Sequence, residues 1–348
     1  MIQTFRRFFL AWVVCASLGC AAHAATGTSA AWSEALHGSS DRLLLYALSN
    51  NPPADARPLM ASMIYDLGAT QAPLPVRYNW EISPILSWDG NFNNRTPGKS
   101  FNIAGFHFVV DPESRAVGGL VLGALTTASA KWRYRFASTL TLTGWASAET
   151  LPEADMSRKG LGMSLCASDY RGDWIWFDAC VQQRILDPAL DDPYGETRLS
   201  AGPTWLSKAK GATYEMAPHL GLNLQEGQSR PSVGLDYSAA VPDLGATNFS
   251  IEAAKHIPDW HGVTFSARAG LARSVFRKST AINLQYDQVT GGRFFGEPRR
   301  DNVFTVGVNR RVSDQATASF GWRRVKSSVG LYDEAGFTMA LSFASWTF

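Results

Sequence analysis

The feature that most constrains this chain is an alternation of apolar and polar residues that begins near residue 76 and continues toward the C-terminus. In 139–143 leucines alternate with threonines, and in 220–225 leucines alternate with Gly, Asn and Gln. In 263–271 Val, Phe, Ala and Leu alternate with Thr, Ser, Arg and Gly. A period of two is what a strand with two differently solvated faces requires. The sequence therefore predicts an all-β fold after residue 75.

The polar face separates two all-β architectures. A sandwich turns its apolar face inward, whereas a membrane barrel turns its apolar face to lipid and lines its lumen with small and charged residues. The predicted strands are about 10 to 14 residues long, which suits tilted membrane strands better than a sandwich. Solvent-facing sandwich strands can carry a similar mixture of charges, so that alternative stays open. The charged residues assigned to the lumen are Arg133, Arg135, Arg198, Asp236, Glu252 and Arg268.

The alternation predicts an antiparallel transmembrane barrel of about 14 strands, an even number that puts both ends on one side. Short links then fall on one side and the longest links, 92–116 and 289–301, on the other. The strand-like segment 98–110 is placed in the first outer loop, and twelve or sixteen strands are the alternatives. The predicted strands are 77–91, 117–128, 133–147, 157–168, 173–185, 196–207, 211–225, 230–240, 246–256, 263–275, 280–288, 302–312, 316–327 and 335–348.

The N-terminus has the anatomy of a secretory signal peptide. Arg6 and Arg7 precede a short apolar run at 8–19, and Ala-His-Ala at 22–24 is a small-x-small cleavage site. The apolar run is too short for a spanning helix, which needs about 20 residues. A lipoprotein signal ending at Cys20 is the alternative. We expect residues 1–24 to be removed and the protein to reach the outer membrane of a Gram-negative cell.

Residues 25–75 differ from the segment at 76–348 that we assign to the barrel. Between 30 and 68 apolar residues recur at helical spacing, and Ser40 or Asp41 is suited to cap a helix. We expect short helices on the periplasmic side. A poorly ordered leader is the alternative.

The net charge limits the classes of partner. The formal net charge of +2 predicts neither nucleic acid nor a strongly acidic partner.

The two cysteines of the predicted barrel suggest a disulfide. Cys166 and Cys180 lie on neighbouring predicted strands, nearly opposite one another, and an exported protein meets an oxidising compartment. A cross-strand disulfide is predicted if the two Cα atoms lie within about 7 Å. Two reduced structural thiols are the alternative.

No arrangement of residues predicts catalysis, a metal or a cofactor. The densest cluster places His256, Asp259 and His261 within six residues, but on a proline-containing segment without helical spacing. Zinc ligands are usually more regularly spaced. There is no Gly-x-Ser-x-Gly motif. We therefore expect no enzyme activity.

Aromatic and basic residues suggest contacts with lipid and partners. Trp132, Tyr134, Trp174 and Trp176 lie near short links and are candidates for an interfacial girdle, with core packing as the alternative. The predicted outer loop at 289–301 is basic and aromatic. It could contact lipopolysaccharide phosphates or a protein partner through its side chains, although an ordinary solvated loop is the alternative. The residues concerned are Arg293, Phe294, Phe295, Arg299 and Arg300.

The C-terminus ends in Trp346-Thr347-Phe348, which resembles the signal recognised by the machinery that assembles outer-membrane barrels. Phe337 to Phe343 place apolar residues at odd positions, whereas Trp346 and Phe348 fall at even positions. One extra residue near 344–345 restores a common face, so the sequence predicts a β-bulge there.

Four short motifs resemble the barrel of the surface lipoprotein assembly modifier (Slam) family. They are the Arg-rich strand at 320–324, the turn and Tyr-Asp pair at 327–333, the Asp-x-Asn-type segment at 89–94, and Arg-Arg-Asp at 299–301. The resemblance implies a barrel that exports or displays a lipoprotein or secreted client. Family members carry tetratricopeptide repeats before the barrel, and this sequence has no 34-residue repeat. That departure weakens the implied role in client recognition.

Three functions remain open. The first is export or display of a partner protein, the second is passive diffusion of solutes, and the third is a structural or adhesive barrel. A wide porin-type pore usually has more than 14 strands, which modestly favours the first.

Overall fold

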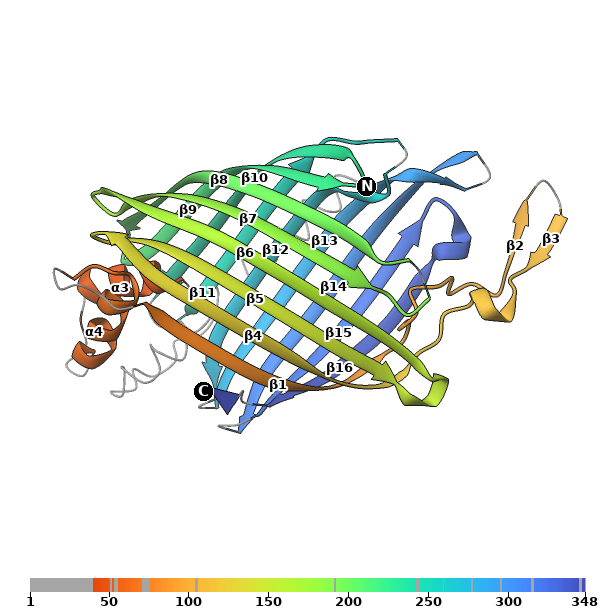
Figure 1. Cartoon of the computed structure of the whole chain (residues 1–348), viewed down its shortest axis with the longest axis horizontal. Coiled ribbons are helices and arrows are strands. Elements are labelled where there is room, and N and C mark those ends of the chain that lie inside the picture. The colour runs from red at the N-terminus through yellow and green to blue at the C-terminus, as the bar shows by residue number, and fades with distance from the viewer. Residues whose placement is uncertain are drawn as a thin grey trace.

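The computed structural model describes residues 40–50, 52, 56–70, 76–103, 106–190, 192–241, 244–258, 260–276, 278–294, 296–313, 316–343 and 346–347. The predicted signal peptide and Phe348 lie outside these residues. Within them, fourteen long strands form an antiparallel sheet that closes because β16 pairs with β1 (Figure 1). The fold predicted from the alternation is therefore confirmed. The wall strands are β1 (Arg77–Asp89), β4 (Gly119–Arg135), β5 (Ser138–Leu151), β6 (Met156–Gly172), β7 (Ile175–Asp187), β8 (Tyr194–Ala209), β9 (Ala212–Gln225), β10 (Gln228–Val241), β11 (Gly245–Ala254), β12 (Gly262–Val275), β13 (Lys278–Phe294), β14 (Glu297–Ser313), β15 (Ala316–Ser327) and β16 (Glu334–Phe343).

The remaining elements lie at the two ends of the barrel. Helices α3 (Asp41–Asn50) and α4 (Arg57–Asp66) lie at one end, which we call the helix mouth (Figure 1). The other end, which we call the loop mouth, carries the hairpin of β2 (Ser100–Ile103) and β3 (Phe106–Val109). It also carries three short 3-10 helices, η1 (Pro112–Ser114), η2 (Pro152–Ala154) and η3 (Gly330–Tyr332). None of the described helices is long and apolar enough to cross a membrane.

The outward face of the wall is apolar. Leu220 is 69% exposed and Phe337 is 71% exposed, and both alternate along their strands with residues on the inner face. Large apolar side chains at such exposure are not the packed face of a sandwich, because no second sheet covers them in the described chain. A band of this kind needs lipid against it. The sandwich alternative is therefore wrong.

Tight turns join the strands at the helix mouth. Lys210 and Gly211 both have positive φ, as do Asp173 and Trp174, which is the backbone of a two-residue type I′ hairpin. The first turn lies at 136–137 and not at 129–132 as predicted, since β4 continues to Arg135. Ala137 adopts the positive φ there without a glycine, so the sequence carries no signal for the turn.

The predicted outer loop at 289–301 is instead a continuation of two strands. β13 and β14 are each 17 residues long; β13 ends at Phe294 and β14 begins at Glu297. Gly291 and Gly292 have positive φ and coincide with a shift in register between Thr290 and Arg293. The two glycines of this predicted loop therefore form a bulge. The long first loop, at 90–118, is present as predicted and contains β2 and β3.

The barrel closes along a seam with a shift in register. β16 pairs with β1 from Ile85 opposite Ser342 to Trp88 opposite Met339. The short β17 (Trp346–Thr347) pairs Trp346 with Ile82, which is one residue out of step with β16. Continuing the β16 register would place residue 345 opposite Ile82, so the strand gains one residue between Ser342 and Trp346. The shift is the extra residue that the parity of the C-terminal residues predicts.

Candidate functional site

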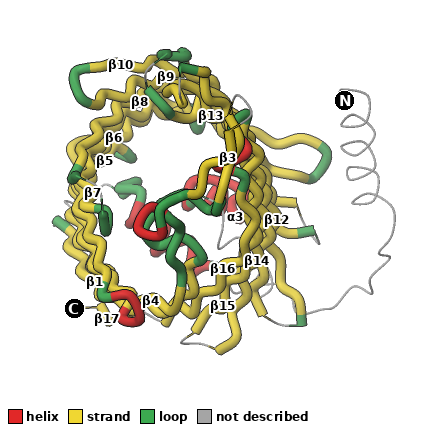
Figure 2. Tube along the Cα trace, turned by 90° about the vertical axis from the view of Figure 1, so that its right-hand side faces the viewer, coloured by secondary structure: helices red, strands yellow, loops and turns green. Residues whose placement is uncertain are grey.

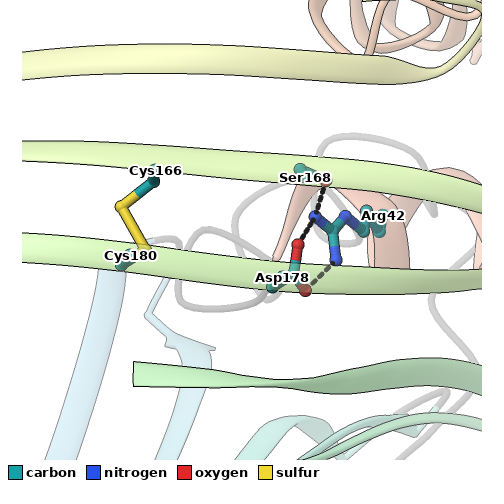
Figure 3. Close-up of a disulfide and its surroundings, with 5 residues drawn as sticks. All are labelled: Arg42, Cys166, Ser168, Asp178 and Cys180. Atoms are coloured by element: carbon teal, nitrogen blue, oxygen red, sulfur yellow. Dashed lines mark hydrogen bonds and ion pairs between the residues drawn. A yellow bond between two sulfur atoms is a disulfide. The ribbon is translucent and has the colours of Figure 1, made fainter. Parts of the chain in front are cut away.

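The lumen face is defined by β6 and β7. Phe177 and Val181 are exposed on the outside of β7, whereas Trp176 is 3% exposed and packs with the N-terminal helices. Cys166 and Cys180 stand directly opposite one another on the inner face and form a disulfide, with Cα atoms 4.1 Å apart (Figure 3). The inward residues of all the remaining wall strands can be assigned from this pair, because residues that stand opposite one another on neighbouring strands lie on the same side of the sheet.

Arg42 of α3 binds this inner face two residues along from the disulfide. Its guanidinium donates to both carboxylate oxygens of Asp178, at 2.8 and 2.7 Å, and to the Ser168 hydroxyl (Figure 3). Thr204 also donates to Asp178, at 2.6 Å, and the Trp176 ring lies under the guanidinium, 4.8 Å from centroid to Cζ. A bidentate arginine–carboxylate pair of this kind fixes both position and orientation. We call Arg42, Asp178, Ser168 and Thr204 the helix latch.

An apolar cluster lies between the N-terminal helices and the barrel wall, next to the helix latch. Ser40 precedes α3 and its hydroxyl accepts from the Leu43 N–H at 3.1 Å, so the predicted cap is present. The leucines that follow at helical spacing turn one face to the barrel wall, and the Ser40 hydroxyl also donates to Glu215 of β9. This face is nearly solvent-free, with Leu43 at 0% and Leu48 at 2% exposure. The buried members of the cluster are Leu43, Leu44, Leu45, Ala47, Leu48, Ala56, Met63, Trp176, Leu206, Ala240 and Ala246.

The N-terminal segment crosses the helix mouth. α3 lies against β8, β9 and β10, while the end of the segment is attached to β4 and β5. There the Ala137 N–H donates to the Gly68 carbonyl at 3.0 Å and Arg133 donates to the Thr70 carbonyl. β4 and β10 lie six places apart in a ring of fourteen strands. The segment therefore spans nearly the full width of the mouth.

The first loop extends over the loop mouth. Phe92 and Asn93 are buried, and the Asn93 side chain donates to the Arg115 carbonyl and accepts from the Val117 N–H. From this anchor Arg95 donates to the Leu190 carbonyl between β7 and β8. The Gly98 N–H donates to the Leu331 carbonyl in η3, between β15 and β16. Figure 2 looks along the barrel from this end and shows loop segments within the ring of strands.

Side chains of the predicted outer loop meet that first loop. Phe294 packs on Phe101 of β2 and on Tyr332, with ring centroids 5.5 and 5.6 Å apart. Arg299 lies over the Tyr332 ring at 3.5 Å and pairs with Asp301 at 2.7 Å. Arg293 and Arg300 lie on the same hairpin, and Phe295 lies outside the described residues. These contacts show how the hairpin joins its neighbours, and a role in partner binding stays a prediction.

The loop at 328–333 is fastened by Asp333. This carboxylate accepts from the Ser327 N–H at 2.8 Å and pairs with Lys326. Desolvation raises the pKa of Asp333, but the hydrogen bonds from Lys326 and Ser327 outweigh it and hold the pKa below its usual range.

Five of the six charged residues predicted to line the lumen stand at inward positions. Arg133 reaches the N-terminal segment, and Arg198 pairs with Glu252 at 2.8 Å. Asp236 and Arg268 both stand opposite Ser250, on either side of β11. Arg135 differs, because a register shift after Arg133 pairs it with Ser138 on the outer face. There it binds Asp169 near the rim of the helix mouth.

The Arg198–Glu252 pair extends across two intervening strands. Between β8 and β11 the inner face carries Gly221 and Gly234, where an added Cβ would overlap the Ser232 hydroxyl and the His219 ring. Glycine therefore makes room for the Ser232 hydroxyl and the His219 ring on this face. The alternation of small and charged residues in the sequence corresponds to this packing.

The histidines of the 256–261 segment do not converge. His256 is 2.8 Å from the Thr290 hydroxyl, and His261 is 3.2 Å from Asp301 and 2.8 Å from the Gly291 carbonyl. Asp301 also accepts from Ser327 at 2.5 Å. In the described part of the chain no group of three His, Cys, Asp or Glu side chains could hold a metal ion.

The predicted aromatic girdle is partly wrong. Tyr134 is exposed on the outer face, as a girdle residue would be. Trp176 instead points into the lumen and donates from its indole nitrogen to the Ala137 carbonyl at 3.1 Å. Trp174 is partly buried in the cluster under α3 and packs against Tyr46 at 4.8 Å. Both tryptophans pack under the N-terminal helices at the helix mouth, because the turn at 173–174 lies at that end of the barrel.

Sequence reasoning missed the helix latch. Arg42 lies in the first turn of an otherwise ordinary amphipathic helix, and Asp178 is an acid between apolar residues near the start of β7. The available signal was the inward parity of Asp178, which places a charge in a lumen that must supply it with a partner.

These features define a transmembrane β-barrel of the outer-membrane type. The sequence matches no protein-family model and no curated protein, so membership of the Slam family is not confirmed. Among solved structures, OprB of Pseudomonas putida is 7% identical, with a TM-score of 0.45, over 84% of this chain and 97% of that one. The outer membrane protein OpdK of Pseudomonas aeruginosa is 8% identical, with a TM-score of 0.43, over 79% and 99%. The KdgM porin, solved in complex with oligogalacturonate, is 10% identical, with a TM-score of 0.29, over 53% and 92%. The barrel architecture rests on the pairing of the strands and not on these distant likenesses.

Proposed function

We propose that the protein is an outer-membrane channel for small hydrophilic solutes. In this proposal the signal peptide at 1–24 directs export, and the helix mouth faces the periplasm because short turns lie on that side of outer-membrane barrels. α3 then limits passage at the periplasmic end. The partners are outer-membrane lipid and the barrel-assembly machinery, which would read the C-terminal Trp346 and Phe348.

The observation that carries this proposal is the exposure of inward-facing charges on several strands of the wall. The side chains of Arg184 and Asp236 are 53% and 55% exposed, although both point into the barrel. Arg268 is exposed as well. Side chains sealed inside a dry protein core are not exposed in this way, and charges there require water or partners. A lumen that admits water to charged groups on several strands supports solute passage.

Three sets of contacts would control that passage. The helix latch and the apolar cluster hold α3 against one sector of the helix mouth, and the ties to β4 and β5 hold the end of the N-terminal segment, at Gly68 and Thr70. The latch is a small set of side-chain contacts, so its loss frees α3 without breaking the wall. The channel would therefore conduct weakly with α3 docked and strongly with α3 released.

Reconstitution of the purified full chain in planar bilayers tests this proposal. We expect small stepwise currents from the native protein and larger currents from Leu48→Asp, which puts a charge into the cluster under α3. Ser49→Asp, on the exposed face of the same helix, is the matched control and should behave like the native protein. Absence of current from both the native protein and Leu48→Asp, with folding verified by heat-modifiable migration, would overturn it.

Export or surface display of a protein client is the second candidate. The observation that favours it is that the helix mouth accommodates a helical polypeptide, α3, against the inner wall. Deletion of the gene followed by comparison of surface-exposed proteins separates the two. Loss of one specific protein from the surface favours export, whereas an unchanged surface with slower solute uptake favours the channel.

A further inference from the structure

We propose that Asp236 and Arg268 form a binding site for small zwitterionic solutes, the class that includes free amino acids, in the middle of the lumen. This inference rests on the channel function proposed above and names its solute class. The two side chains lie near the centres of β10 and β12, on the inner face. They flank Ser250 of β11, which stands opposite both of them.

Other inward charges in this part of the wall are already paired. Arg198 binds Glu252 at 2.8 Å and Arg184 binds Glu196 at 2.8 Å. Asp287 is buried and accepts from Ser266 and Gln285 at 2.7 and 2.6 Å. Paired charges largely cancel one another at the distance of a passing solute.

Asp236 and Arg268 differ from these pairs. The neighbour of Asp236 is the His219 ring, whose Nδ1 lies 3.4 Å from the Asp236 carboxylate and 3.4 Å from the Ala217 carbonyl. Arg268 makes no ion pair or side-chain hydrogen bond with the described residues. Both side chains are exposed to the lumen. They are therefore the wall charges most available to a solute.

Their separation suits a molecule that carries both signs of charge. Neighbouring strands lie about 4.8 Å apart, so the two Cα atoms are about 10 Å apart across β11. A guanidinium binds a carboxylate through two parallel hydrogen bonds, and an aspartate accepts from an ammonium. A simple anion would meet repulsion from Asp236, and a simple cation would meet repulsion from Arg268. A zwitterion satisfies both, with the Ser250 hydroxyl between them as a neutral donor or acceptor.

Solute uptake into proteoliposomes tests this inference. The experiment uses the Leu48→Asp form, so that α3 does not limit entry, and compares alanine with glycerol and acetate at low concentration. We expect Asp236→Asn and Arg268→Gln each to lower the alanine-to-glycerol rate ratio about two- to fivefold, the range for exposed ion pairs. Arg324→Gln, on the outward face of β15, is the matched control and should leave the ratio unchanged.

The exchange of the two charges adds a second readout. The double variant Asp236→Arg with Arg268→Asp keeps one charge of each sign and should recover most of the alanine preference. An unchanged ratio in both single variants, while glycerol passes, overturns the site and leaves the channel standing. Equal loss of acetate and alanine in Arg268→Gln, with no effect of Asp236→Asn, shows an anion site and also overturns the inference. Failure of every solute to enter overturns the channel itself.

Discussion

The two mouths of the barrel are closed by different kinds of contact. At the helix mouth a separate helix is held by an arginine, a carboxylate and an apolar face. At the loop mouth the loop at 90–118, which joins the wall strands β1 and β4, is held by backbone and amide hydrogen bonds and by packed aromatic rings. A docked helix can leave as a unit, whereas a loop fastened at both ends by β1 and β4 cannot. The helix mouth is therefore the end suited to open.

The largest effect is expected from Leu48→Asp. Leu48 is 2% exposed in the cluster under α3, and an unpaired carboxylate there costs several kcal/mol, so that α3 undocks. We expect α3 to become accessible to protease and the open probability in bilayers to approach one. The Ser49→Asp control keeps α3 protected. Protection of α3 in Leu48→Asp would contradict the comparison.

Arg42→Ala tests the helix latch directly. Loss of its hydrogen bonds to Asp178 and Ser168 is expected to destabilise docking by about 2 kcal/mol, which corresponds to roughly a 30-fold shift toward the open state. Single-channel recording measures this shift. Arg171→Ala is the control, since Arg171 pairs with Asp169 at the same mouth without touching α3. An equal shift in both variants would assign the effect to rim charge.

Asn93→Ala is directed at the loop mouth. The change leaves the Arg115 carbonyl and the Val117 N–H without their buried partner, at about 1 to 2 kcal/mol. We expect roughly tenfold faster proteolytic cleavage within 90–118 and an open probability close to native. Glu113→Ala, at an exposed position of the same loop, should not alter cleavage. A rise in open probability as large as that of Arg42→Ala would show that the two mouths are equivalent.

The smallest effect on either mouth is expected from Cys166→Ser with Cys180→Ser. β6 and β7 are paired along their full length, so the wall keeps its shape without the bond. A disulfide closing a loop of 14 residues stabilises the folded state by about 3 kcal/mol, mainly through the unfolded chain. We expect a lower unfolding temperature at unchanged open probability, measured by thermal melting and bilayer recording. A changed open probability would place the disulfide in the gating of α3.

Much of the wall could be predicted from the sequence because strand parity and membrane exposure act on the same residues. The disulfide partners followed from the positions of two neighbouring predicted strands, and the bulge before Trp346 followed from parity. The boundaries of β13 and β14 did not, because Gly291 and Gly292 form a bulge where a loop was expected. Arg135 was misassigned for a similar reason, since one shifted residue moves a side chain to the other face. The helix latch depends on a contact between residues 136 positions apart, and no local pattern encodes such a contact.

The seam between β16 and β1 has a mechanical consequence. β1 pairs with β4 along its whole length, from Arg77 to Asp89, but its pairing with the C-terminal strand is interrupted between Ile85 and Ile82 by the shifted register. A closed sheet separates first where the pairing of its strands is least continuous. This joint is also the last that the chain can make, because it unites the first wall strand with the last. We therefore expect the barrel to close at the β1–β16 seam during assembly. We expect heat or detergent to separate the strands first at the same seam.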